Sequence, residues 1–248
     1  IQFELDGKIK SAHEKVNDIY KKAKRKNIDD QIIKCFFYQS KFLQVSEADY
    51  QAIIIANLNT EINGSEGSKK AILNYIYVSI LESYYQNNRY SINKLTDLEA
   101  TGSNDFKTWT GKDFEKNIDE IYGDLLKDEN KLRETKIDAY ASILEISPYT
   151  DAKKMSVYDF LQPKVVGYYF KSIYFLNNQE HQTLVTQLLT NSAAFVEIKT
   201  DTLSVENLKK GIQVLQNNEI YGLKNNNDDL HALQYSRMKL FYNYVIDK

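Results

Sequence analysis

Apolar residues recur at spacings of three and four along most of the chain, with lysine, glutamate and asparagine between them. This period is typical of amphipathic helices, which bury one apolar stripe and leave the other face to water. A first helix is predicted over 6–26, where Asn27 ends it. A second is predicted over 29–44, with apolar residues crowded enough to indicate burial on more than one side: Ile32, Ile33, Cys35, Phe36, Phe37 and Leu43, with Ser40 among them.

Residues that favour helix N-termini indicate where the next two helices begin. Ser46, with Asp49 three residues later, has the spacing of a capping box and predicts a helix that runs to about Ile62. The polar run 63–68 predicts a turn, and Ser68 is expected to cap a fourth helix. The buried side of that fourth helix is predicted to contain Ile72, Tyr75, Ile76, Ser79, Ile80 and Ser83.

These four helices make two consecutive hairpins of roughly 30–40 residues each, which is the period of tetratricopeptide-like repeats. The whole chain has nine glycines and two prolines, too few for the many tight turns of a sandwich or barrel. The predicted fold class is therefore all-α, with antiparallel helix hairpins stacked as a tetratricopeptide-like α-solenoid.

Cap spacings also predict the elements of the second half. Thr110 with Asp113, and Ser156 with Asp159, indicate helices over 112–127 and 157–176. Pro163 inside the latter is expected to kink it near Asp159. The remaining predicted elements are helices over 130–146, 203–221 and 228–246, and an extended segment over 191–202.

The longest stretch without helical periodicity covers 89–107. We expect one helical-repeat domain over 1–248, with two subdomains over 1–90 and 105–248, joined by the 91–104 loop, as the alternative. The chain begins at Ile1 without methionine or a signal-peptide pattern, so we expect it to be a mature or excised piece of a larger protein.

Charge and residue chemistry exclude several function classes. With 32 basic and 34 acidic residues, the net charge of −2 offers no basic excess for nucleic acid. No apolar stretch reaches the roughly 18 residues of a membrane span. The only cysteine, Cys35, lies among Ile and Phe, so we expect an unreactive core thiol with a raised pKa. His13-Glu14 lacks the second histidine of a zinc-protease motif, because Asn17 stands there.

No catalytic residue, metal ligand or cofactor site is therefore predicted, and the chain is not expected to be an enzyme. The nineteen tyrosines have two interpretations. They form a surface that binds a partner, or they fill helix-hairpin cores with their hydroxyls at the rim. The candidate interaction surface consists of the clustered tyrosines: Tyr84, Tyr85, Tyr168, Tyr169, Tyr242 and Tyr244.

Several segments resemble the N-terminal helical region of the large alpha-2-macroglobulin-like proteins of Bacteroidetes. They are KSAHEKVNDIYKKAKRKN (10–27), DQIIKCFFYQSKF (30–42), AILNYIYVSILESYYQNNRY (71–90), DFKTWTGKDFEKNIDEIY (105–122) and SVYDFLQPKVVGYYF (156–170). All are packing signatures, and none is catalytic. The chain departs from the pattern at Gln162-Pro163, and the similarity weakens after Asn177.

The resemblance implies a periplasmic or outer-membrane-associated, multidomain protein that traps proteases or interacts with a host. Its macroglobulin domains, bait region and thioester have no counterpart in this chain. We therefore expect a non-catalytic interaction scaffold that docks to its own downstream macroglobulin domains or to an envelope protein. The alternative is a carbohydrate-binding helical module of an outer-membrane glycan-uptake lipoprotein.

The resemblance also draws attention to the tripeptide 201–203. This Asp-Thr-Leu sequence is similar to the Asp–Ser/Thr–apolar pattern at which Bacteroidetes O-glycosylate exported proteins. Thr202 is therefore a candidate O-glycosylation site. The other interpretation is that aspartate and threonine are ordinary residues of loops and helix caps.

Overall fold

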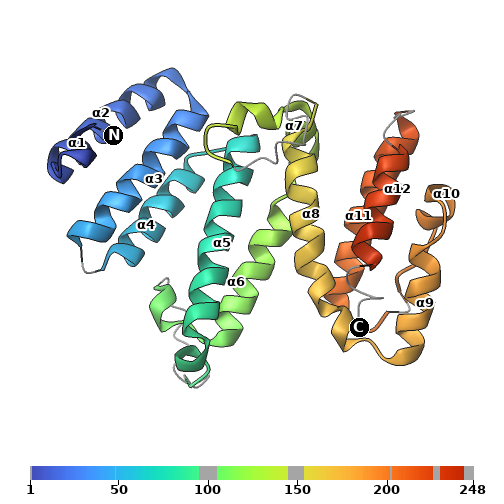
Figure 1. Ribbon diagram of the computed structural model, residues 1–248. Coiled ribbons are helices and arrows are strands. Elements are labelled where there is room, and N and C mark those ends of the chain that lie inside the picture. The colour runs from blue at the N-terminus through green and yellow to red at the C-terminus, as the bar shows by residue number, and fades with distance from the viewer. Residues whose placement is uncertain are drawn as a thin grey trace. The chain divides into compact units, whose positions relative to one another are not determined.

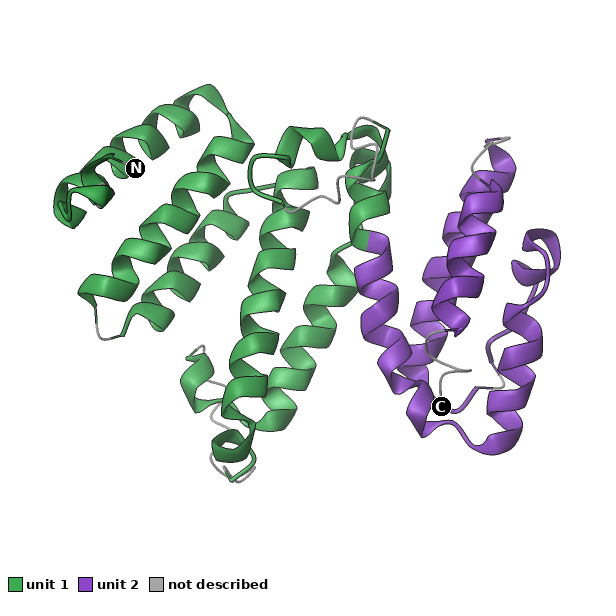
Figure 2. Ribbon diagram, viewed as in Figure 1, with its two compact units in different colours: residues 1–161 green, residues 162–248 purple. Residues whose placement is uncertain are grey.

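The computed structural model describes residues 2–47, 49–94, 105–144, 154–201, 203–225 and 230–242, and throughout these ranges its regular elements are helices. The all-α prediction is confirmed for this part of the chain. The chain divides into two compact units, residues 1–161 and 162–248 (Figure 2). The division falls within a helix, α8 (Val157–Phe170), and residues 95–104 of the loop suggested from the sequence lie outside the described residues.

Unit 1 begins with helices that pack in chain order (Figure 1). Helix α2 packs against α3, α3 against α4, α4 against α5, and α5 against α6. Their bounds are α1 (Gln2–Leu5), α2 (Ile9–Lys26), α3 (Asp29–Ser46), α4 (Tyr50–Asn63), α5 (Gly67–Ile92) and α6 (Gly111–Asp124). The shorter helices of this unit are η2 (Phe106–Thr108), α7 (Glu129–Glu134) and η3 (Ile137–Tyr140).

Asn27 ends α2 as predicted. It adopts the left-handed conformation, with φ of 51°, and its backbone N–H donates to carbonyl oxygens of the last turn. Asparagine tolerates this conformation better than most residues with a side chain. The turn lets α3 fold back along α2, so the two lie side by side in Figure 1.

Two of the four predicted caps are confirmed. The Thr110 hydroxyl accepts from the Asp113 N–H, and the Asp113 carboxylate accepts from the Thr110 N–H at 2.9 Å. The hydrogen bonds that this carboxylate accepts from the Thr110 N–H, foremost, and from the Thr110 hydroxyl lower the pKa of Asp113. Ser156 and Asp159 make the same reciprocal pair at the start of α8.

The other two predicted caps are wrong. Ser46 is the last residue of α3, and its hydroxyl donates to the carbonyl oxygen of Phe42. Helix α4 begins only at Tyr50. Ser68 lies inside the first turn of α5, where its hydroxyl donates to Thr135 at 2.8 Å. Both serine hydroxyls thus donate a hydrogen bond without capping a helix.

The helix predicted over 130–146 is also wrong, because pairing with a distant segment interrupts it. Helix α7 ends at Glu134. The Ile137 N–H then donates to the Met155 carbonyl, and the Val157 N–H donates to the Thr135 carbonyl. These bonds form an isolated antiparallel bridge that the helical spacing of 130–146 could not reveal.

The core of unit 1 draws on α3, α4, α5, the 132–140 segment and the first turns of α8. Phe36, predicted to be buried, is 5% exposed and belongs to it. The fully or nearly fully buried members are Ile33, Leu58, Ile72, Leu73, Leu132, Ile137, Val157, Tyr158 and Leu161.

Unit 2 contains the end of α8 and the elements that follow: η4 (Lys171–Phe175), α9 (Asn178–Leu188), α10 (Ser192–Phe195), α11 (Glu206–Lys224) and α12 (Leu230–Phe241). Helices α9 and α11 both pack against α12. Its core contains Val166, Phe170, Ile173, Leu184, Leu188, Phe195, Leu208, Ile212 and Phe241.

Two elements of unit 2 differ from the prediction. Part of the segment expected to be extended forms α10, where the Asn191 side chain accepts from the Ala194 N–H. Helix α9 was not predicted, although Asn177 and Glu180 form a complete capping box at its start. That Asn-x-x-Glu spacing was the signal that could have revealed α9.

Candidate functional site

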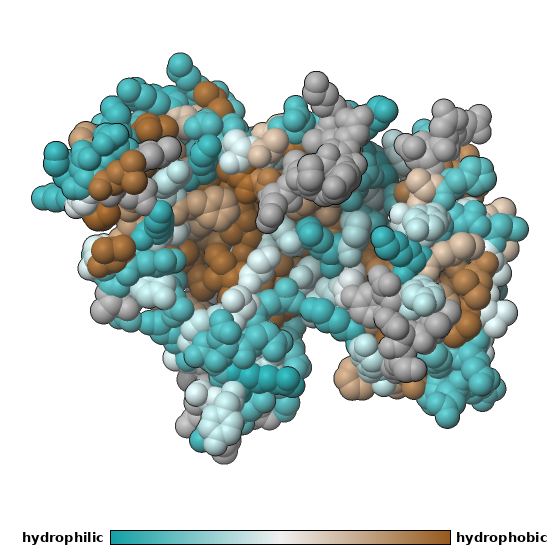
Figure 3. Space-filling view, in the orientation of Figure 1, coloured by the Kyte–Doolittle hydropathy of each residue, from teal (hydrophilic) through white to brown (hydrophobic). Residues whose placement is uncertain are grey.

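A groove of about 660 Å³ lies within unit 1 between α3, α4 and α5. Figure 3 shows the matching hollow, where brown apolar side chains gather beside α5. The lining residues are Phe36, Phe37, Ser40, Lys41 and Gln44 of α3, Tyr50, Gln51, Ile54 and Ile55 of α4, and Tyr75, Ile76, Ser79, Ile80, Ser83, Tyr84, Asn87 and Asn88 of α5, together with Phe106 of η2.

The floor of the groove is apolar. Ile54, Ile55 and Ile76 are each 5–8% exposed, so they belong to the core and still border the open space. Phe37 was predicted to be buried, but its side chain is 41% exposed. Its side chain lines the groove instead of the core.

The α5 wall is the stripe that the sequence had predicted to be a buried side. Ile72 and Ile76 are buried as expected, but Ser83 is exposed and Ile80 is only partly buried. Leu73, Val78 and Leu81, which the prediction left out, are 0% exposed, so periodicity identified a face of α5 that is only partly buried. That face borders a groove over much of its length instead of another helix.

Side-chain hydrogen bonds fix the polar residues of this wall. The Ser79 hydroxyl donates to the Tyr75 carbonyl at 2.7 Å. The Asn88 amide donates to the Tyr84 carbonyl at 2.9 Å, and the Asn87 amide lies 3.5 Å from the Ser83 hydroxyl oxygen. Each bond uses a donor of the side chain and leaves its carbonyl or hydroxyl oxygen with capacity to accept more.

The groove carries little charge. Among its described lining residues Lys41 is the only charged one, and none of them is a carboxylate. An ion pair beside it joins Lys107 to Asp49 at 2.6 Å and lowers the pKa of Asp49, chiefly through the hydrogen bond from Lys107. The lining is thus suited to a neutral ligand with apolar parts.

Aromatic contacts hold one end of the groove. Tyr84 meets Phe106 edge-on, with ring centroids 4.8 Å apart. Phe114 of α6 stacks on Tyr85 at 5.3 Å and meets Trp109 edge-on at 5.2 Å. Such pairs stabilise a fixed geometry, so η2 presents Phe106 to the groove on a rigid support.

The clustered tyrosines are not alike. Tyr84 borders the groove and Tyr85 packs on α6, whereas Tyr169 is 2% exposed and belongs to the interior of unit 2. Tyr168 packs on Tyr169 at 5.2 Å, and Tyr242 is 56% exposed. Tyr244 and the candidate glycosylation site Thr202 lie outside the described residues. An interaction surface made of this set stays a prediction.

A buried carboxylate joins three helices of unit 1. Glu61 of α4 accepts from the Tyr20 hydroxyl at 2.5 Å, and it lies 3.1 Å from the Lys24 ammonium and 2.6 Å from that of Lys69. Burial opposes ionisation of Glu61, but the hydrogen bonds from Lys69, Tyr20 and Lys24 outweigh it and lower the pKa. Burial and the bond to Glu61 raise the pKa of Tyr20.

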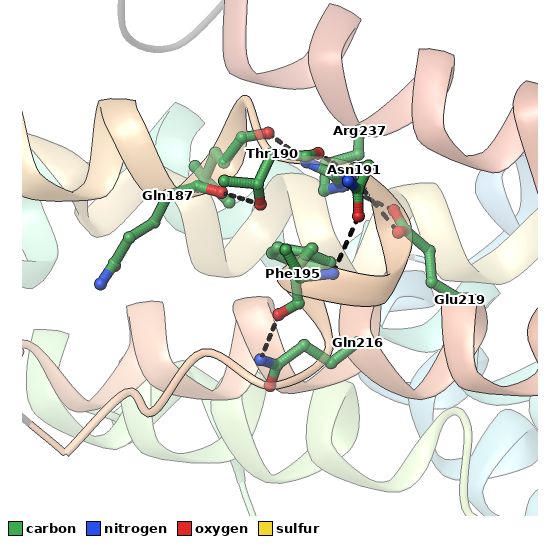
Figure 4. Close-up of polar contacts among 9 residues, drawn as sticks. Gln187, Thr190, Asn191, Phe195, Gln216, Glu219 and Arg237 are labelled. Carbon is green, nitrogen blue, oxygen red and sulfur yellow. Dashed lines mark hydrogen bonds and ion pairs between the residues drawn. The ribbon is translucent and has the colours of Figure 1, made fainter.

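Unit 2 has a buried ion pair of its own (Figure 4). Arg237 of α12 donates to the Glu219 carboxylate of α11 at 2.6 Å, and both side chains are at most 2% exposed. The same guanidinium donates to the carbonyl oxygens of Leu188 and Thr190 at the end of α9. It also lies 4.1 Å from the centroid of the Phe195 ring. These contacts join α9, α10, α11 and α12.

Neither charged cluster has the composition of a metal site. Over the described ranges, no group of three or more His, Cys, Asp or Glu side chains could hold a metal ion. Cys35 is buried, and burial raises its pKa, as predicted. No helix within the described ranges combines the length and apolarity needed to cross a membrane.

Comparison of the chain with protein-family models, curated proteins and solved structures gives no significant match. The all-α class therefore comes from the structure, and the resemblance to alpha-2-macroglobulin-like proteins depends only on the segments quoted above.

Proposed function

We propose that this chain is a non-catalytic interaction domain that binds a segment of a protein partner in the groove between α3, α4 and α5. The observation that carries the proposal is an open apolar floor of Ile54, Ile55, Ile76 and Phe37 within one compact unit. An exposed apolar concavity rimmed by polar residues is typical of a binding site.

A protein segment fits this lining better than a glycan does. The floor is formed by three isoleucine side chains and the Phe37 ring, none of which can hydrogen bond to sugar hydroxyls. Burying such hydroxyls without partners is costly. Aliphatic and aromatic side chains of a peptide would instead gain from leaving water, at about 25 cal/mol per Å² of apolar surface.

The wider setting belongs to the same proposal. We infer that the hairpins α2–α3 and α4–α5 are stacked units of a tetratricopeptide-like solenoid, because consecutive helices pack on one another. The resemblance adds an envelope-located, alpha-2-macroglobulin-like parent protein, with its own macroglobulin domains as one source of the bound segment. A reading frame that continues past Lys248 into β-rich macroglobulin repeats would support that setting.

Site-specific photo-cross-linking in the source organism tests the binding function. A benzophenone amino acid replaces Ser83, which is exposed and lines the groove, and in a control replaces Asn57, which is exposed on α4 outside the lining. We expect one defined protein adduct from position 83, identified by mass spectrometry, and none from position 57.

The cross-link should also disappear when Ile80→Lys places a charge in the groove. Equal adducts at positions 83 and 57, or no adduct at position 83, would contradict the proposal. An adduct whose mass and composition identify a glycan would favour the carbohydrate-binding alternative.

A further inference from the structure

We infer that the groove binds its partner as an extended, uncharged peptide segment with bulky apolar side chains at alternate positions. This inference depends on the proposed function and specifies the conformation and chemistry of the bound segment. It follows from how amide side chains, apolar side chains and charges are distributed over the two walls and the floor.

Both walls of the groove carry primary amides. Gln44 of α3 and Gln51 of α4 line one side, and Asn87 and Asn88 of α5 line the other. Within the described residues neither glutamine has a hydrogen-bonding partner, and both are exposed. Each amide offers donor and acceptor capacity.

An extended peptide needs the hydrogen-bond donors and acceptors that these amides provide. Its backbone N–H and C=O groups point sideways, and each requires a partner when it leaves water. A bound helix satisfies the same groups internally and would make no use of amide-bearing walls. The α5 side chains are also held in place, since Asn88 donates to the Tyr84 carbonyl and Ser79 to that of Tyr75.

The floor determines which side chains the segment carries. Successive side chains of a strand point to opposite faces, so every second one would enter the groove. There they meet Ile54, Ile55, Ile76 and Ile80. Bulky aliphatic or aromatic residues at alternate positions therefore bury the most apolar surface.

The charge of the lining excludes strongly ionic segments. Of the lining residues that the structure describes, only Lys41 is ionic, so an acidic or basic segment would lose water and gain few matched partners. The groove has a volume of about 660 Å³, which is enough for several large side chains of a bound segment rather than one. A neutral, apolar-alternating strand meets all of these conditions.

Selection from a displayed library of linear 12-residue peptides tests the inference on the whole 248-residue chain. The library is first depleted on the Ile80→Lys variant and then selected on the unmodified chain. We expect the retained peptides to place Leu, Ile, Phe or Tyr at i, i+2 and i+4, with few Asp, Glu, Lys or Arg. If circular dichroism shows that Ile80→Lys does not fold, Ser83→Arg at an exposed groove position replaces it.

A synthetic copy of one retained peptide then measures the role of the amides. The double variant Asn87→Ala/Asn88→Ala should weaken binding about tenfold, as expected for the loss of one or two hydrogen bonds. Asn57→Ala, a matched asparagine on the surface of α4, should leave the affinity unchanged. Unchanged affinity in the double variant would overturn the role of the amides.

The outcomes separate this inference from the proposed function. Retained peptides with apolar residues at i, i+3, i+4 and i+7, or with a strong charge, would overturn the extended neutral segment and leave a protein-binding groove intact. If no peptide distinguishes the unmodified chain from the groove variants, both the inference and the proposed function are wrong.

Discussion

Removing the buried guanidinium of unit 2 should strongly destabilise the protein. In Arg237→Met, the Glu219 carboxylate would stay 2% exposed and lose its partner at 2.6 Å. The carbonyl oxygens of Leu188 and Thr190 would lose their donor as well. Breaking a buried pair by removing one partner typically costs about 3–5 kcal/mol, so we expect unfolding free energy to fall by that amount.

The double variant Arg237→Met/Glu219→Met distinguishes an orphaned charge from lost packing. It removes both charges and leaves only the two carbonyl oxygens unpaired, which costs about 1–3 kcal/mol. The double variant should therefore be more stable than Arg237→Met alone. Glu206→Gln is the control on the same helix, because the Glu206 side chain is 72% exposed and its pair with Lys209 should contribute less than about 1 kcal/mol.

Urea denaturation followed by far-ultraviolet circular dichroism measures these changes. Fluorescence of the only tryptophan, Trp109, reports unit 1 in the same samples. We expect Arg237→Met to lower the midpoint of the circular dichroism transition. A loss below about 1 kcal/mol, or a double variant no more stable than the single one, would refute the reasoning that a buried unpaired carboxylate dominates the cost.

Three further predictions concern the packing of both units. Phe36→Ala should cost about 3–5 kcal/mol in urea melts, since the ring is 5% exposed in the core of unit 1; a loss under about 1 kcal/mol would contradict that placement. Ionised Glu61 should stabilise the fold fully above its ordinary pKa of about 4.5 and less as the pH falls through its lowered folded value. Melts from pH 6 to 3 should therefore lose stability more steeply in the unmodified chain than in Glu61→Gln, and parallel curves would exclude this role. Gly211→Ala should destabilise unit 2 by about 1–3 kcal/mol, because its Cβ would lie 3.0 Å from the buried Phe170 ring. Gly222→Ala, whose Cβ would meet only flexible leucine tips, should cost less, and the reverse order would contradict the packing argument.

Local chemistry made much of the fold predictable from the sequence. The end of α2 at Asn27 and the Thr110–Asp113 cap depend on residues within one turn of each other, and both were predicted correctly. The predicted cap at Ser46 is wrong although its spacing fits a capping box. Helix α3 continues to Ser46, and the Ser46 hydroxyl donates to the Phe42 carbonyl. The spacing of a motif cannot reveal such a competing partner.

Long-range contacts explain what the sequence could not provide. The bridge that interrupts 130–146 pairs Lys136 with Ser156, twenty positions later. Glu61 meets Tyr20 of another helix, and Arg237 reaches the end of α9. In each of these contacts the two partners are too far apart in the sequence to lie on one helix face. The sequence alone therefore made Glu61 and Arg237 look like ordinary surface residues.

The groove also could not be predicted from the sequence, and this matters for function. Periodicity identified the face of α5 that contains Tyr75, Ser79 and Ser83, but a pattern of apolar positions does not say what covers that face. Ser79 and Ser83 were the available sign, because a hydroxyl within an otherwise apolar stripe can hydrogen bond to water. In the structure that stripe borders the open floor, and Ser83 is exposed. If the proposed function is right, the feature that weakens α5 as a core helix is the one that forms a wall of the binding groove.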